Sequence, residues 1–239
     1  MSSLRERAGF REPYGEAAFS KTIREADHGE VAEWSKALVS KTSVPQGTVS
    51  SNLTLSAMTK YVALLRGIGP TNPNMRNEKL RGVFEELGFR NVQTLISSGN
   101  VLFESASKNP QMLEAKIEKA LPRYLGFSST TIIRSHAELT QLAARNPFKG
   151  AEHGAKSYLV VTFLKNKTTA KIEFPHRPQN KTYELLMMHD RAICSVIDLS
   201  GAKTPDLMTW LEKRFGKEIT TRTWKTVSRI LKKMGGADA

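Results

Sequence analysis

The sequence predicts an α+β protein in which a ferredoxin-like β-α-β-β-α-β subdomain (58–135) precedes a second small α+β subdomain (136–239). Two observations support this prediction. From Met58 onward, short apolar runs of strand length alternate with apolar stripes at helical spacing, and Gly, Pro or Asn separates them. The composition, with 39% hydrophobic and 25% charged residues among 239, is that of a globular protein.

The first subdomain opens with the apolar run 61–65, which ends at Arg66-Gly67 and predicts a buried strand. Pro70 and Pro73 then require a loop. A helix follows, because one apolar stripe repeats at helical spacing: Leu80, Val83, Phe84 and Leu87. Gly88 stands where a left-handed cap ends such a helix.

A hairpin is predicted next, since the strand-like runs 92–96 and 101–103 are joined by Ser97-Ser98-Gly99-Asn100. Asn109-Pro110 has the order of a cap followed by the first residue of a second helix. The run 130–133 supplies a fourth strand. Together these elements give the β-α-β-β-α-β order.

The second subdomain begins with a capping box, Ser135 to Glu138, in front of a helix. Three strands are expected in it, at 158–164, 183–188 and 192–197. A helix is expected from Thr204-Pro205, and the last helix from about Thr223 to Met234. We expect the hydroxyl-rich segment 220–223 to lie at the start of that last helix.

In residues 1–57 the apolar residues follow neither the helical nor the strand period for long, and this segment is expected to be disordered. Their codons suggest why: Gly29 to Trp34 can be written GGA GAG GTG GCC GAG TGG, the start of a serine transfer-RNA gene, and 49–57 can encode a T-loop and the complementary end of the acceptor stem. Residues 38–42 permit an anticodon stem with a serine anticodon. We hypothesise a mis-assigned start read through such a gene, with translation beginning at Met58; the alternative is a genuine disordered tail.

Several classes of protein are excluded or disfavoured. No run of about 18 apolar residues spans a membrane. The single cysteine, Cys194, cannot form an internal disulfide, and no secretory signal is present, so we expect a cytoplasmic protein. Gly67-Ile68-Gly69 lacks the third glycine of a dinucleotide fingerprint. Zinc and esterase motifs are absent, and no cofactor or metal is expected.

The net charge of +13 lies entirely after residue 57, because residues 1–57 hold equal numbers of basic and acidic side chains. Such a charge favours an anionic partner. Candidate ligand-binding residues lie after the first strand, in the hairpin turn and near the last helix: Arg66, Gly67, Ser98, Asn100, Arg222 and Trp224. The alternative for these is an Arg paired with a carboxylate and an ordinary Thr cap.

A basic stripe on the last helix is the candidate surface for nucleic acid: Lys225, Arg229, Lys232 and Lys233. A solvated helix face is the ordinary alternative. We therefore keep two functional hypotheses. The first is a noncatalytic module that binds a phosphorylated small molecule or nucleic acid; the second is an enzyme on a small anionic substrate, with Ser98, Asn100 and Arg66 converging. A shared pocket would favour a small ligand, and a flat basic patch would favour nucleic acid.

Several motifs carry a family resemblance: Tyr61 to Ile68, Leu87-Gly88-Phe89, Ser98-Gly99-Asn100-Val101, Asn146-Pro147-Phe148 and Thr221 to Val227. With them the chain resembles the bacterial family called domain of unknown function 1697 over nearly all of 58–239. The resemblance implies an α+β protein of two subdomains and no established activity. Gly69-Pro70 and Thr223 depart from the family pattern, which has asparagines at the corresponding points, so no pocket role of those asparagines transfers.

Overall fold

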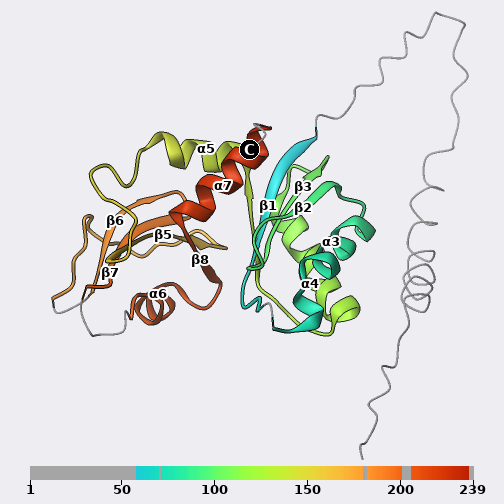
Figure 1. The fold of residues 1–239 in the computed structure, drawn as a ribbon, viewed down its shortest axis with the longest axis horizontal. Helices are drawn as coiled ribbons and strands as arrows, with labels where there is room; N and C mark the ends of the chain where they lie inside the picture. The colour runs from blue at the N-terminus through green and yellow to red at the C-terminus, as the bar shows by residue number, and fades with distance from the viewer. Residues whose placement is uncertain (1–57, 70, 180–181, 201–205, 237–239) are drawn as a thin grey trace, which may run out of the picture. The chain divides into compact units, whose positions relative to one another are not determined.

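The structure is a computed structural model, and it describes residues 58–69, 71–179, 182–200 and 206–236 (Figure 1). The disorder and start-site hypotheses for 1–57, and the helix start expected at Thr204-Pro205, lie outside these residues. The described residues all lie within one compact unit. Within the described part of the chain, no helix is long and apolar enough to cross a membrane.

The first sheet has four antiparallel strands in the order β2-β3-β1-β4. Its elements follow the predicted order, with a short 3-10 helix added after the first strand: β1 (Thr59–Leu65), η2 (Pro73–Met75), α3 (Asn77–Glu86), β2 (Arg90–Thr94), β3 (Asn100–Ser105), α4 (Pro110–Leu125) and β4 (Thr131–Ser135). The α+β class and this element order agree with the prediction.

Strand β1 is buried on both faces, which explains its unbroken apolar run. Because side chains alternate along a strand, Tyr61, Ala63 and Leu65 pack with α3 and α4, while Val62 and Leu64 enter a second core. That second core also receives side chains from α5 (His136–Ala144) and α7 (Trp224–Gly235). Figure 1 shows these two helices side by side.

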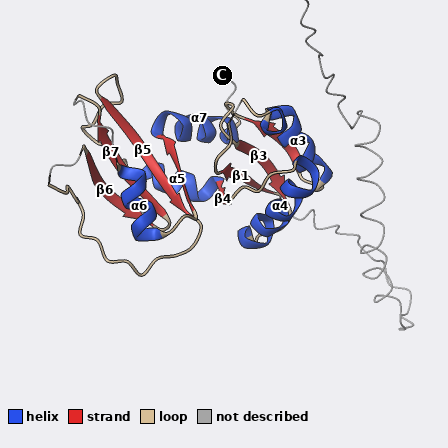
Figure 2. Ribbon diagram, turned by 90° about the horizontal axis from the view of Figure 1, so that it is seen from below, coloured by secondary structure: helices blue, strands red, loops and turns tan. Residues whose placement is uncertain are grey.

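The second sheet also has four antiparallel strands, in the order β6-β7-β5-β8. They are β5 (Ser157–Leu164), β6 (Tyr183–His189), β7 (Ala192–Asp198) and β8 (Ile219–Thr223), and α6 (Leu207–Phe215) precedes β8 in the chain. Figure 2 shows β5, β6 and β7 with α6. The expectation of three strands is wrong. Residues 219–223 are rich in β-branched side chains and pair with β5 instead of beginning the last helix. That helix starts at Trp224, and Thr223 caps it.

The two sheets repeat one topology. In each, the first strand lies between the third and the fourth, and a helix follows the fourth strand directly, α5 after β4 and α7 after β8. The registers also correspond, because Val62 of β1 faces Arg134 of β4 and Val161 of β5 faces Arg222 of β8. The repeats differ between the first and second strands, where the first has η2 and α3 and the described residues of the second have no helix.

The core position of Cys194 gives a test of this fold. The side chain is fully buried, and burial raises the pKa of its thiol from 9.0 to about 12. We expect iodoacetamide at pH 8 to label Cys194 only when the chain unfolds, with a urea dependence that follows unfolding measured by circular dichroism. Mass spectrometry after quenching measures the labelled fraction. Rapid complete labelling without urea would contradict the assignment of Cys194 to the core.

The same burial predicts a pH dependence. In the unfolded chain the thiol ionises near 9.0, whereas in the folded chain it stays protonated to about 12. Its contribution to the free energy of unfolding is therefore fully present below pH 9 and is lost as the pH rises toward 12. Cys194→Ala removes this ionisation, so stability curves of the variant and the parent chain should differ in slope only above pH 9.

Candidate functional site

Arg222 lies where the end of β1, the 98–100 turn and β8 meet. Its Nε, Nη1 and Nη2 atoms donate to five oxygens at 3.0 Å or less, and Nη2 makes a longer contact of 3.5 Å with Gly99 O. The five are Asn100 Oδ1 at 2.6 Å, Thr220 Oγ1 at 2.8 Å, Thr221 O at 2.9 Å, Leu65 O at 2.8 Å and Ser98 O at 3.0 Å. A guanidinium has five N–H donors, so these contacts account for all of them. Desolvation lowers the pKa of Arg222 to about 10.

The predicted residues Ser98, Asn100 and Arg222 are thus brought together. Asn100 is 1% exposed, and its Nδ2 donates to Leu95 O at 2.9 Å and to Ser98 Oγ at 3.0 Å. Arg222 itself occupies the point where the segments converge. The arrangement is a hydrogen-bonded junction whose polar groups are satisfied by one another.

The other predicted ligand-binding residues lie near this junction in different roles. Arg66 donates to Glu212 Oε1 at 2.5 Å and also to the carbonyl oxygens of Lys217 and Ile219. This is the carboxylate pairing that stood as the alternative for Arg66. Trp224 packs against Phe148 with ring centroids 5.2 Å apart and belongs to the second core. Gly67, at φ +73°, forms the exposed turn after β1.

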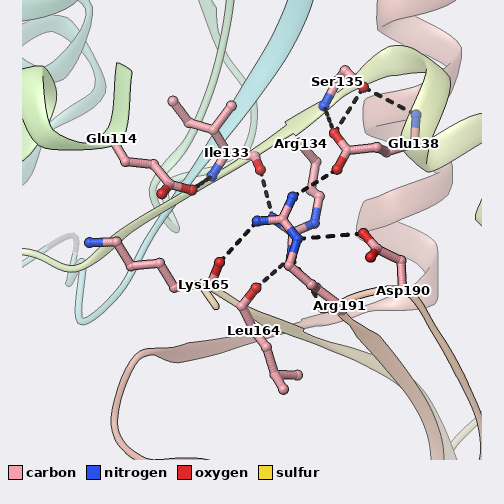
Figure 3. Close-up of polar contacts among 9 residues, drawn as sticks. All are labelled: Glu114, Ile133, Arg134, Ser135, Glu138, Leu164, Lys165, Asp190 and Arg191. Carbon is pink, nitrogen blue, oxygen red and sulfur yellow. Dashed lines mark hydrogen bonds and ion pairs between the residues drawn. The ribbon is translucent and has the colours of Figure 1, made fainter. Parts of the chain in front are cut away.

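A second junction holds Arg134, which is 2% exposed (Figure 3). Its Nη2 donates to Leu164 O at 2.6 Å and Arg191 O at 3.1 Å, and its Nη1 donates to Ile133 O at 2.7 Å. Desolvation, together with the neighbouring positive charge of Arg191, lowers the pKa of Arg134 to about 10. By strand register, Arg134 in the first sheet corresponds to Arg222 in the second sheet.

Arg191 connects this junction to two carboxylates. It donates from Nη2 to Glu138 Oε1 at 2.9 Å, from Nη1 to Lys165 O at 2.9 Å and, more weakly, from Nε to Asp190 Oδ2 at 3.4 Å (Figure 3). Glu138 also accepts the N–H of Ser135 at 2.7 Å, which completes the predicted capping box. Glu138 therefore fixes the start of α5 and the position of Arg191 together.

Buried Glu114 borders the same junction (Figure 3). It is 1% exposed and accepts the N–H of Ile133 at 2.9 Å. Burial raises the pKa of Glu114, while that hydrogen bond and the positive charge of Lys165 oppose the rise. Its carboxylate ties α4 to the strand that carries Arg134.

The two repeats exchange these contacts. Arg222 of the second repeat reaches the carbonyl that ends β1, and Arg134 of the first reaches the carbonyl that ends β5. The basic residues directly after β1 and β5, Arg66 and Lys165, likewise each pair with a carboxylate of the other repeat. Arg66 pairs with Glu212 on α6, and Lys165 pairs with Glu118 on α4 at 2.7 Å. The polar groups at both junctions therefore hold the two sheets to each other.

A small cavity of about 130 Å³ adjoins the Arg134 junction, and its polar lining includes Arg134, Glu138, His189, Asp190 and Arg191. Ligand pockets usually measure about 300 to 1,000 Å³. Glu138 and Asp190 also balance the two arginine charges. The cavity therefore suits a few water molecules better than a phosphorylated ligand.

The basic stripe predicted on the last helix is a surface of α7. Its four members are all exposed: Lys225, Arg229, Lys232 and Lys233. The opposite face of the helix is buried through Val227, Ile230 and Met234. None of the four forms an ion pair with another described residue. We refer to these four side chains as the α7 face. Among the described residues, no group of three or more His, Cys, Asp or Glu side chains is placed to hold a metal ion.

Residues 58–193 match the family described as "Protein of unknown function (DUF1697)". The chain belongs to this family. This DUF1697 protein is also similar to a solved structure, that of the conserved bacterial protein SP0830 from Streptococcus pneumoniae. The two are 22% identical with a TM-score of 0.57, over 74% of this chain and 99% of that one, which indicates a similar fold. A search of the curated proteins finds no match.

Sequence reasoning overlooked three residues of the DUF1697 chain that form the second junction: Arg134, Glu138 and Arg191. A signal for Arg134 was present, because a charged residue interrupts an otherwise apolar strand directly before the Ser135 cap. Arg222 stands in the same position before the Thr223 cap. For Glu138 the sequence pattern predicts only the capping role, and nothing local distinguishes Arg191.

Proposed function

We propose that this protein is a noncatalytic module that binds the phosphate backbone of nucleic acid through the α7 face. One observation carries the proposal. The buried or partly buried arginines of the two junctions bond within the chain, whereas the four cations of the α7 face are exposed and have no ion-pair partner among the described residues. Exposed, unpaired cations arranged on one helix face are suited to phosphate contacts that release counterions.

The position of Lys225 supports this proposal. It lies in the first turn of α7, which contains no acidic residue. A cation there opposes the helix dipole at a cost of about 0.3 to 1 kcal/mol. By contrast, Lys232 and Lys233 lie in the last turn, where cations stabilise a helix. Helix stability therefore explains why lysines stand at positions 232 and 233, but it does not explain the lysine at position 225. Binding of an anion would explain Lys225.

The alternative enzyme with Ser98, Asn100 and Arg66 is less well supported. Asn100 uses both its amide oxygen and its amide nitrogen within the junction, and Ser98 accepts a hydrogen bond from it. Arg66 is paired with Glu212. Substrate binding would have to break these contacts in a buried place, at a cost that a preformed site avoids.

The proposal is tested by removing the α7 face. With Lys225, Arg229, Lys232 and Lys233 all changed to Gln, we expect the logarithm of the affinity for a 20-nucleotide single-stranded RNA to depend on the logarithm of salt concentration with a slope smaller by about three. Fluorescence anisotropy at several salt concentrations measures the slope.

A matched control removes four exposed lysines elsewhere: Lys108, Lys119, Lys156 and Lys167, each changed to Gln. This variant has the same net charge as the first and should keep most of the parent slope. Equal losses of slope in both variants would show a response to net charge alone. That result, or no RNA binding by the parent chain at low salt, would refute the proposal.

A further inference from the structure

The connection after the first strand differs between the two repeats. In the first, α3 covers the sheet beside α4. In the second, the described residues between β5 and β6 contain no helix, and α6 packs on that face with only Ile172 and Phe174 of the connection beside it. The place that a helix takes in the first repeat is thus only partly filled in the second.

A cavity of about 700 Å³ lies between this connection and α6. Its volume is within the usual range for small-molecule sites, about 300 to 1,000 Å³. It is lined by Lys171, Ile172, Glu173, His176, Trp210, Lys213 and Arg214.

Two aromatic side chains of the cavity lining contact each other. The rings of His176, on the connection, and Trp210, on α6, are 5.4 Å apart at an interplanar angle of 31°. Trp210 is also in contact with the rings of Tyr183 and Phe215, at 6.3 and 6.4 Å. These contacts hold the indole in place while it stays partly exposed. A held, partly exposed indole suits stacking with a planar ring.

The rest of the lining is mostly cationic. Lys171, Lys213 and Arg214 are exposed and face a single carboxylate, Glu173. Arg214 donates from Nη2 to Lys171 O at 3.1 Å, which ties the connection to α6. None of the three cations forms an ion pair with another described residue. Phosphate oxygens are the natural partners of such a group.

We propose that this cavity binds a nucleoside diphosphate, with the base stacked on Trp210 and His176 and the phosphates held by Lys171, Lys213 and Arg214. An aromatic wall beside a cationic rim matches the two parts of that ligand. An apolar ligand would leave the cationic rim unused, and a bare anion would leave the aromatic wall unused. This site is separate from the α7 face and does not depend on nucleic-acid binding there.

The test is calorimetric titration of the full chain with ADP. We expect binding of ADP, and at least tenfold weaker binding both of adenosine, which lacks the phosphates, and of pyrophosphate, which lacks the base. Lys213→Gln with Arg214→Gln should weaken ADP binding at least tenfold. Trp210→Leu should weaken binding of ADP by about tenfold and leave pyrophosphate unchanged, because the substitution removes the ring on which the base stacks.

The control is Lys232→Gln with Lys233→Gln, which removes the same charge from α7. It should leave ADP affinity unchanged, whereas the Lys213 and Arg214 variant should bind the 20-nucleotide RNA as the parent chain does. The proposal is overturned if millimolar ADP does not bind, if pyrophosphate binds as tightly as ADP, or if both double variants lose ADP affinity equally. Loss of RNA binding in the α6 variant would also overturn it, by making these cations part of one polyanion surface.

Discussion

Arg222→Met is expected to lower the free energy of unfolding by about 3 to 5 kcal/mol, a large effect for a single substitution. Methionine keeps much of the side-chain length but donates no hydrogen bond. Leu65 O, Ser98 O and Asn100 Oδ1 would each lose a charged donor at the junction. An unsatisfied buried acceptor costs about 1 to 3 kcal/mol, and water entering the junction would recover part of it. Urea unfolding followed by circular dichroism measures the change.

Arg229→Met is the matched control. Arg229 is exposed on α7 and forms no ion pair with another described residue, so the same chemical change should alter stability by no more than about 0.5 kcal/mol. If the two substitutions cost the same, the Arg222 contacts contribute nothing beyond an ordinary surface side chain. The exchanged arginines would then not be what joins the two sheets.

The fold of the first subdomain could be predicted because its signals are local. Apolar strands, amphipathic helices and the Gly99 turn each have their own pattern, and the capping box at Ser135 is present as predicted. The strand at 219–223 was missed because a short run of threonines beside a helix also resembles a cap. Only the long-range pairing with β5 distinguishes the two cases.

The repeat was harder to see in the sequence. Arg134 and Arg222 occupy equivalent positions, as do the caps Ser135 and Thr223, yet the connections before them differ in length and no fixed period results. Ser98, Asn100 and Arg222 were predicted as candidate ligand-binding residues from their place in the motifs, and the structure brings them into contact. That these groups bond to one another could not be read from the sequence, because it depends on partners far apart in the chain. Ligand binding by them stays a prediction.

Gly99→Ala is expected to cost about 2 to 5 kcal/mol. Gly99 has φ +72°, a conformation that costs other residues about 1 to 2 kcal/mol. A Cβ there would also lie 2.6 Å from Ile68 Cγ1 and 3.0 Å from Leu65 Cβ, and overpacking adds about 1 to 3 kcal/mol. Gly67→Ala is the control, because φ is +73° and no atom lies within 4 Å of its Cβ position. It should cost only the conformational part, measured by urea unfolding.

The difference between the two glycine variants isolates the close packing of the turn against Leu65 and Ile68. Equal costs would mean that the turn moves aside freely. Because Ser98 O in this turn accepts from Arg222, displacing the turn should also weaken the Arg222 junction. Gly99→Ala combined with Arg222→Met should therefore cost less than the sum of the two single substitutions, by at least about 0.5 kcal/mol. Additive costs would show that the turn and the arginine stabilise the chain independently.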